Sequence, residues 1–155
     1  MEKGVAWPQK LGNALARSCV LVPLWSKQYF NSPWCNAELA YVHAREIKCG
    51  FRTPERPEGL IVPTIIHDGD DLPDEARILN PLNLQKYANI RVAKNSPTLE
   101  ELSNLIQNWV PDVASAIGRA PAYDNGWLKL AVNEFIDLFK VPQQRQRTLP
   151  TLDEV

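Results

Sequence analysis

The sequence predicts an α/β fold built on a small parallel sheet. Two nearly uninterrupted apolar runs, residues 18–25 and 60–66, have the pattern of strands that helices cover on both faces. Between them, residues 33–48 contain no helix breaker and therefore predict a helix. A strand, a helix and a second strand in this order are typical of a parallel sheet.

The central helix starts at a strong capping sequence. Ser32 is a good N-cap, and Pro33 suits the first helical position because its missing N–H would be unpaired there anyway. Trp34 and Glu38 are four residues apart, so the indole and the carboxylate share one face about a turn from each other. Gly50 is expected to end the helix as its C-cap.

The residues after the first strand predict a ligand site. Ser26 and Tyr29 lie in what reads as a loop at the carboxyl end of this strand, where open α/β sheets bind ligands. We expect this loop and the turn that carries Trp34 and Glu38 to form the site. Each residue also has a structural interpretation: Ser26 as the cap of a turn, Tyr29 and Trp34 as packing side chains, and Glu38 as a solvated helix carboxylate.

The rest of the chain supplies flanking elements. The sequence predicts a helix from about Pro8 whose stripe is Trp7, Leu11, Ala14 and Leu15, an exposed connection at 51–59, an acidic loop at 67–71, a helical turn at 73–78, a weak strand at 82–85 and a capped helix from Ser96. Whether this last helix continues after a kink at Pro111 stays open. We assign residues 1–117 to one domain, and residues 118–155 to a linker, an amphipathic helix at 127–140 and a flexible tail.

Composition excludes several classes of function. Seventeen basic and eighteen acidic residues leave a net charge of −1 with no basic run, which gives nucleic-acid binding no support. The apolar stretches are far shorter than a membrane span, so we expect a cytoplasmic protein without a membrane partner. The three cysteines lack metal-type spacing, and the acidic loop lacks the spacing of a calcium loop, so no metal site is expected.

A three-stranded parallel sheet leaves its first strand at an edge. An apolar strand with an unpaired ladder is prone to pair with another chain. The chain therefore reads as though it begins in the middle of a domain.

Several segments together resemble the TIR (Toll/interleukin-1 receptor) domain, most closely its prokaryotic branch. The resemblance covers residues from about 4 to 110, and its most specific part is the Ser-x-Trp-Cys-x-x-Glu-Leu pattern after a strand and a Ser-x-x-Tyr loop. The matching residues are Gly4, Trp7-Pro8, Leu15-Ala16-Arg17-Ser18, Val20-Leu21-Val22-Pro23-Leu24-Trp25-Ser26, Tyr29, Ser32-Pro33-Trp34-Cys35, Glu38-Leu39 and Ile61-Val62-Pro63-Thr64-Ile65.

The resemblance implies a flavodoxin-like parallel sheet with helices on both faces. The family has five strands, and this chain aligns only from the end of the loop before the family's second helix. The resemblance thus implies an N-terminally incomplete fold without the first strand, first helix and second strand. Three explanations stay open: a truncated form, a missing half supplied by another chain, or a fragment that uses its exposed edge in another way.

The resemblance also implies an enzymatic activity. Enzymatic TIR domains cleave the bond between nicotinamide and ribose in NAD⁺, and the family's catalytic glutamate sits in a Trp-x-x-x-Glu pattern that here is Trp34 and Glu38. Trp34, Ser26 and Tyr29 become the expected substrate-binding residues. NAD⁺ is the substrate, so no separate cofactor is expected.

Two alternatives to an enzyme remain. One is a non-catalytic TIR module that self-associates or docks to another TIR chain in a signalling or defence assembly, and a homo-oligomer is also the expected active form of the enzyme. The other is a degenerate fragment without independent function.

Overall fold

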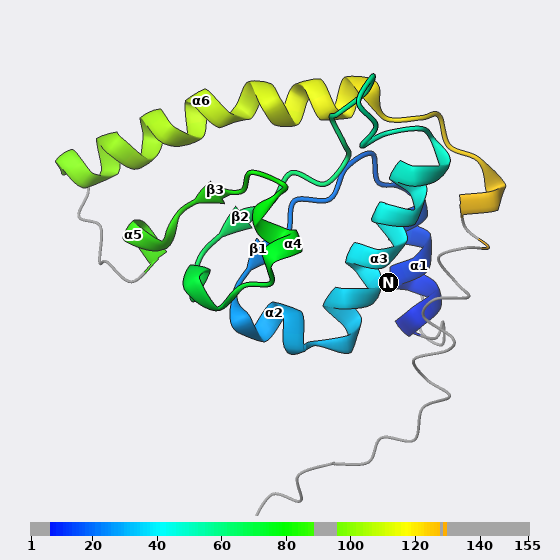
Figure 1. Ribbon diagram of the computed structural model, residues 1–155, viewed down its shortest axis with the longest axis horizontal. Coiled ribbons are helices and arrows are strands. Elements are labelled where there is room, and N and C mark those ends of the chain that lie inside the picture. Colours follow the sequence, from blue (N-terminus) through cyan, green and yellow to red (C-terminus); the bar gives the residue numbers. More distant parts are fainter. Residues whose placement is uncertain (1–6, 89–95, 128, 130–155) are drawn as a thin grey trace, which may run out of the picture.

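The computed structural model describes residues 7–88, 96–127 and 129, which form a small α/β domain (Figure 1). Its elements are α1 (Trp7–Arg17), β1 (Leu24–Trp25), α2 (Lys27–Asn31), α3 (Pro33–Lys48), β2 (Thr64–Ile65), the 3₁₀ turn η1 (Gly69–Asp71), α4 (Asp74–Arg77), β3 (Leu82–Asn83), α5 (Gln85–Ala88) and α6 (Pro97–Arg119). The three strands form a parallel sheet in the order β1-β2-β3. The predicted α/β class and parallel sheet are confirmed.

The regular strands are shorter than the apolar runs that contain them. β1 and β2 pair over two residues each, and a further parallel bridge joins Leu21 to Ile61. Between the bridge and the ladder lie Pro23 and Pro63, which have no N–H to donate. Their carbonyls are still used, since Pro23 accepts a hydrogen bond from the N–H of Thr64 at 3.0 Å and Pro63 accepts one from β3. The two prolines therefore interrupt the ladder without separating the strands.

The expectation that helices cover the first strand on both faces is wrong. Trp25 is fully buried, but the side chains of Val22 and Leu24 are 37% and 54% exposed. Within the described residues, β1 pairs with β2 alone, so its other edge is open. The predicted edge position of this strand is confirmed for the described residues, and the open edge leaves backbone N–H and C=O groups unpaired.

The core consists of two clusters on either side of α3. One joins α1, α3 and the segment that leads into β2, and its buried members are Leu15, Ala16, Ala37, Tyr41, Val42, Phe51, Leu60, Ile61 and Trp127. The other lies at the carboxyl end of the sheet and contains Trp25, Ile65, Leu72 and Ala76. The predicted stripe of α1 is partly wrong, because Ala14 is exposed and Ala16 is buried. The side chain of Trp7 is not among those that the structure describes.

Two adjacent charged residues of α3 attach it to the chain before each strand. The guanidinium of Arg45 donates to the carbonyls of Ser18 and Cys19, both at 2.8 Å. The carboxylate of Glu46 accepts from the N–H of Leu60 and, at 2.9 Å, from that of Ile61. Both side chains are buried. α3 is thus fixed to the segments that lead into β1 and β2.

The boundaries of the helices confirm some predictions from local sequence and correct another. Ser32 caps α3 by accepting from the N–H of Cys35 at 3.4 Å, with Pro33 in its first turn, and Gly50 follows the helix with a positive φ of 72°. The residues read as a loop after β1 instead form the short helix α2. α6 runs without interruption through Pro111.

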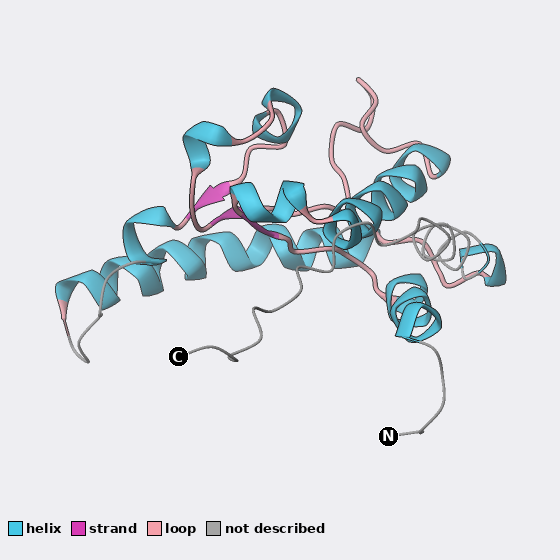
Figure 2. Cartoon of the chain, turned by 90° about the horizontal axis from the view of Figure 1, so that it is seen from below, coloured by secondary structure: helices cyan, strands magenta, loops and turns pink. Residues whose placement is uncertain are grey.

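Helix α6 extends along the molecule, as Figure 1 and the view in Figure 2 show. It ends at Arg119. The linker that we expect from residue 118 therefore overlaps the last two residues of this helix. Most of the predicted helix at 127–140 and all of the tail lie outside the described residues. None of the described helices is long and apolar enough to cross a membrane.

Candidate functional site

Glu38 lies in the second turn of α3, the second helix after β1 along the chain. Its side chain is partly buried, and within the described part of the chain its carboxylate accepts no hydrogen bond and forms no ion pair. Burial raises the pKa of Glu38 above its ordinary value, because the partly apolar surroundings disfavour the charged form. Glu38 therefore combines a raised pKa with the absence of a hydrogen-bond or ion-pair partner in the described chain, and perturbed pKa values cluster at functional sites.

Tyr29 on α2 is the polar neighbour of Glu38. Burial is the main cause that raises the pKa of the Tyr29 hydroxyl, and the negative charges of Glu38 and Cys35 add to the effect. The hydroxyl is buried and has no hydrogen-bond partner among the described residues. Helices α2 and α3 thus bring a phenol and a carboxylate from different elements close together.

Ser26 acts as the cap of α2. It is buried, and its Oγ accepts a hydrogen bond from the N–H of Tyr29 at 3.3 Å. This contact matches the structural interpretation of Ser26, which holds the first turn of α2 and so positions Tyr29. A direct contact between Ser26 and a ligand stays a prediction.

Trp34 shares a face of α3 with Glu38, as its spacing predicts. Its indole is partly buried and packs against the cluster between α1 and α3. The packing interpretation of Trp34 is therefore supported, and the predicted contact with a substrate ring stays a prediction. In the part of the chain that the structure describes, no group of three or more metal-ligating side chains is found.

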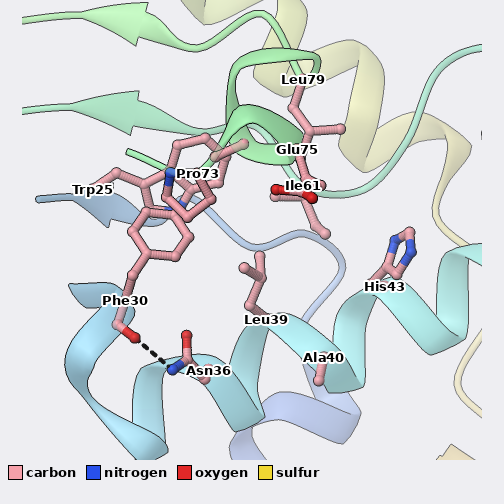
Figure 3. Close-up of a pocket in the computed structure, with 11 residues that line it drawn as sticks. Trp25, Phe30, Asn36, Leu39, Ala40, His43, Ile61, Pro73, Glu75 and Leu79 are labelled. Atoms are coloured by element: carbon pink, nitrogen blue, oxygen red, sulfur yellow. Dashed lines mark hydrogen bonds between the residues drawn. The ribbon is translucent and has the colours of Figure 1, made fainter. Parts of the chain in front are cut away.

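An apolar hollow of about 350 Å³ lies on the face of α3 opposite to Trp34 and Glu38 (Figure 3). It is lined by Trp25, Phe30, Asn36, Leu39, Ala40, His43, Ile61, Pro73, Glu75, Ala76 and Leu79. At 3.6 residues per turn, the α3 residues of the hollow point about half a turn away from Trp34 and Glu38. None of the four predicted site residues lines this hollow, so it is a second feature of the domain and not the cleft expected at Glu38.

Sequence reasoning missed Trp25 and Glu46 as chemically distinctive residues. The indole Nε1 of Trp25 is buried without a hydrogen-bond partner in the described chain, and Glu46 is a fully buried carboxylate. One signal was available for Glu46, since helical spacing places it on an inward face with Val42 and Leu39. A charge among apolar residues on such a face indicates a buried polar contact.

Comparison with known proteins identifies the family. The family model described as TIR domain matches residues 1–103, which is more than half of the chain. No curated protein and no solved structure matches the sequence. The small parallel sheet with its surrounding helices agrees with the α/β architecture of this family. The chain therefore belongs to the TIR domain family.

Proposed function

We propose that this TIR domain is an NAD⁺ glycohydrolase and that Glu38 is its catalytic residue. The observation that carries the proposal is the Glu38 carboxylate, which is partly buried, has a raised pKa and is without a hydrogen-bond or ion-pair partner in the described chain. Along the chain, Glu38 follows the carboxyl end of the parallel strand β1 through the short helix α2, and the carboxyl ends of such strands are the usual place for ligands. A role in cytoplasmic signalling or defence belongs to the same proposal.

One carboxylate is enough for this reaction. The bond between the anomeric carbon of ribose and the nicotinamide nitrogen breaks, and its electron pair returns to the nitrogen. Nicotinamide leaves as a neutral molecule, so no general acid is needed, unlike the pair of carboxylates that ordinary glycosides require. Ionised Glu38 stabilises the positive ribosyl centre, and its raised pKa favours taking the proton of the water that adds there. The products are then ADP-ribose, nicotinamide and a proton.

Neighbouring side chains have supporting roles in this proposal. Tyr29 has a buried, unpartnered hydroxyl beside Glu38 and can donate a hydrogen bond to the carboxylate or to a ribose hydroxyl. Ser26 holds Tyr29 in place through the cap of α2. Trp34 is one turn from Glu38, and the exposed part of its ring offers a surface for stacking the substrate.

Turnover of NAD⁺ by the purified full chain tests the proposal. We expect Glu38→Gln, which keeps the size of the side chain and removes its charge, to lower the rate of nicotinamide release by at least about a hundredfold. Glu100→Gln removes an exposed carboxylate from the first turn of α6 and is the matched control. Activity that survives in Glu38→Gln would remove Glu38 from the mechanism.

A second candidate function is a non-catalytic interaction module, either a homo-oligomer or a complex with another TIR chain. The open edge of β1 favours it, because this strand pairs on one side only within the described residues, and the apolar residues Val22 and Leu24 at this strand are exposed. Leu24→Lys places a charge at this edge and is expected to reduce any association seen by light scattering. Lys129→Leu, a change at an exposed position away from the sheet, is the control. A chain that stays monomeric at all concentrations would count against this function.

A further inference from the structure

The short helix α2 is joined to α3 by a single residue, Ser32. The N–H of Ser32 donates to the carbonyl of Tyr29 at 3.2 Å and ends α2, and the side chain of Ser32 caps the start of α3. α2 has only five residues, and isolated helices shorter than about 12 residues are marginal in water. The orientation of α2 against α3 therefore depends on contacts between the two helices.

Phe30 of α2 is held at both its ring and its backbone. The ring packs against Trp25, with centroids 5.4 Å apart. The carbonyl accepts a hydrogen bond from Nδ2 of Asn36 at 2.7 Å, which Figure 3 shows as a dashed line. Phe30 is among the last four residues of α2, whose carbonyls have no partner inside the helix. Asn36, near the start of α3, supplies the donor that α2 lacks.

Tyr29, the residue before Phe30, interacts with Glu38 of α3. The negative charge of Glu38 is one of the causes that raise the pKa of the Tyr29 hydroxyl. Asn36 and Glu38 are two positions apart, which places them about 200° apart around the helix. Two consecutive residues of α2 thus interact with nearly opposite sides of α3. A tilt of α2 that releases the Phe30 carbonyl therefore also moves the Tyr29 hydroxyl relative to Glu38.

We propose that Asn36 is a positioning residue, whose amide fixes α2 against α3 and so holds the Tyr29 hydroxyl beside Glu38. The inference rests on the proposed function, in which Tyr29 donates a hydrogen bond to Glu38 or to a ribose hydroxyl. Asn36 is exposed, so water can pair with the Phe30 carbonyl when the amide is removed. Loss of the amide therefore changes the position of α2 more than the stability of the domain.

NMR measures the interaction between Tyr29 and Glu38 without NAD⁺. The chain has four tyrosines. In ¹H–¹³C spectra of the full chain with ¹³C-labelled tyrosine rings, the signal that is lost in Tyr29→Phe is assigned to Tyr29. We expect this signal to shift as Glu38 titrates, and the shift to be absent in Glu38→Gln. We expect Asn36→Ala to reduce the shift at least about twofold, because the influence of a charge falls with distance. Asn36→Gln keeps the amide donor and is expected to retain most of the shift.

The rate of nicotinamide release tests the same link in the proposed reaction. We expect Asn36→Ala to lower kcat about tenfold, since a misplacement of about 1 Å can cost up to about a hundredfold. In a Tyr29→Phe background the same change should lower kcat less than about twofold, because a residue that acts through the Tyr29 hydroxyl has no effect without it. Asn31→Ala is the matched control and should leave kcat unchanged. Asn31 is an exposed asparagine at the end of α2 whose side chain makes no hydrogen bond in the described structure.

Circular dichroism should show melting temperatures of the Asn36 and Asn31 variants within about 3 °C of the original chain. If Asn36→Ala melts lower than this, Asn36→Leu, which keeps the approximate size of the side chain and has no donor, replaces it.

Four results would overturn the proposal. These are a Tyr29 signal that does not respond to Glu38 in the original chain, an undiminished shift in Asn36→Ala, a kcat that Asn36→Ala leaves unchanged or lowers no more than Asn31→Ala does, and an equal effect of Asn36→Ala with and without the Tyr29 hydroxyl. An original chain that releases no nicotinamide would refute the proposed function, and the NMR titration alone would then decide on Asn36.

Discussion

Replacing Glu46 with alanine removes the carboxylate that holds α3 to the segment that leads into β2. This carboxylate accepts from the backbone N–H groups of Leu60 and Ile61 and from Nε and Nη2 of Arg52, at 3.2 and 3.1 Å. His43 adds a longer contact at 3.4 Å. The side chain of Glu46 is fully buried.

The expected loss of stability follows from the groups that are left unpaired. Each buried N–H without an acceptor costs about 1 to 3 kcal/mol, so Leu60 and Ile61 together account for about 2 to 6 kcal/mol. Breaking a buried ion pair by removing one partner costs about 3 to 5 kcal/mol. The side chain of Arg52 is 23% exposed and can regain some hydration, which places its contribution toward the low end. We therefore expect Glu46→Ala to lower the free energy of unfolding by about 5 kcal/mol, the sum of the two low ends.

Urea unfolding of the full chain, followed by circular dichroism, measures this loss. Glu46→Gln keeps one acceptor oxygen and loses the charge, so we expect about half of the effect of alanine. Glu55→Ala, at an exposed position of the neighbouring connection, is the control and should change stability by less than about 0.5 kcal/mol. A loss below about 1 kcal/mol for Glu46→Ala would refute the anchoring role, and so would equal losses for Ala and Gln.

Three further changes test the packing beside Glu46, the burial of the Tyr29 hydroxyl and the raised pKa of Glu38. Gly59→Ala places a Cβ 2.2 Å from the Arg52 and Glu46 side chains, and chemical denaturation should show a loss of about 1 to 3 kcal/mol. Tyr29→Phe removes a buried hydroxyl without a partner in the described chain, so the melting temperature should stay equal or rise. Burial raises the pKa of Glu38, so the folded state holds that proton more tightly than the unfolded state and loses relative stability as pH rises through the carboxyl range. Melting curves should therefore show Glu38→Gln above the original chain at pH 7, with no difference below the ordinary carboxyl pKa.

Local sequence signals predicted the central helix well. Ser32 and Pro33 define its start, and Gly50 its end, through contacts within a few residues of each boundary. The strands were predicted in the right place but too long, since their regular pairing is limited by Pro23 and Pro63. Apolar patterning shows where a strand lies, whereas the length of its ladder depends on which N–H groups its neighbours can use.

Contacts between elements distant in sequence were beyond local prediction. The interaction of Tyr29 on α2 with Glu38 on α3 joins two elements, and the local sequence of neither helix predicts it. The burial of Glu46 depends on the connection at 51–59 folding back over α3. The exposure of Leu24 depends on what pairs with the edge of β1, and the composition of the strand does not encode this.

The central claim is that Glu38 performs chemistry on NAD⁺. Its most direct test is a time course of nicotinamide released from NAD⁺ by the full chain and by Glu38→Gln, separated chromatographically at equal protein concentration. We expect steady release by the original chain, and a rate for the variant that is lower by at least about a hundredfold. Equal release by the two proteins, or no release by the original chain in either its monomeric or its associated form, would contradict it.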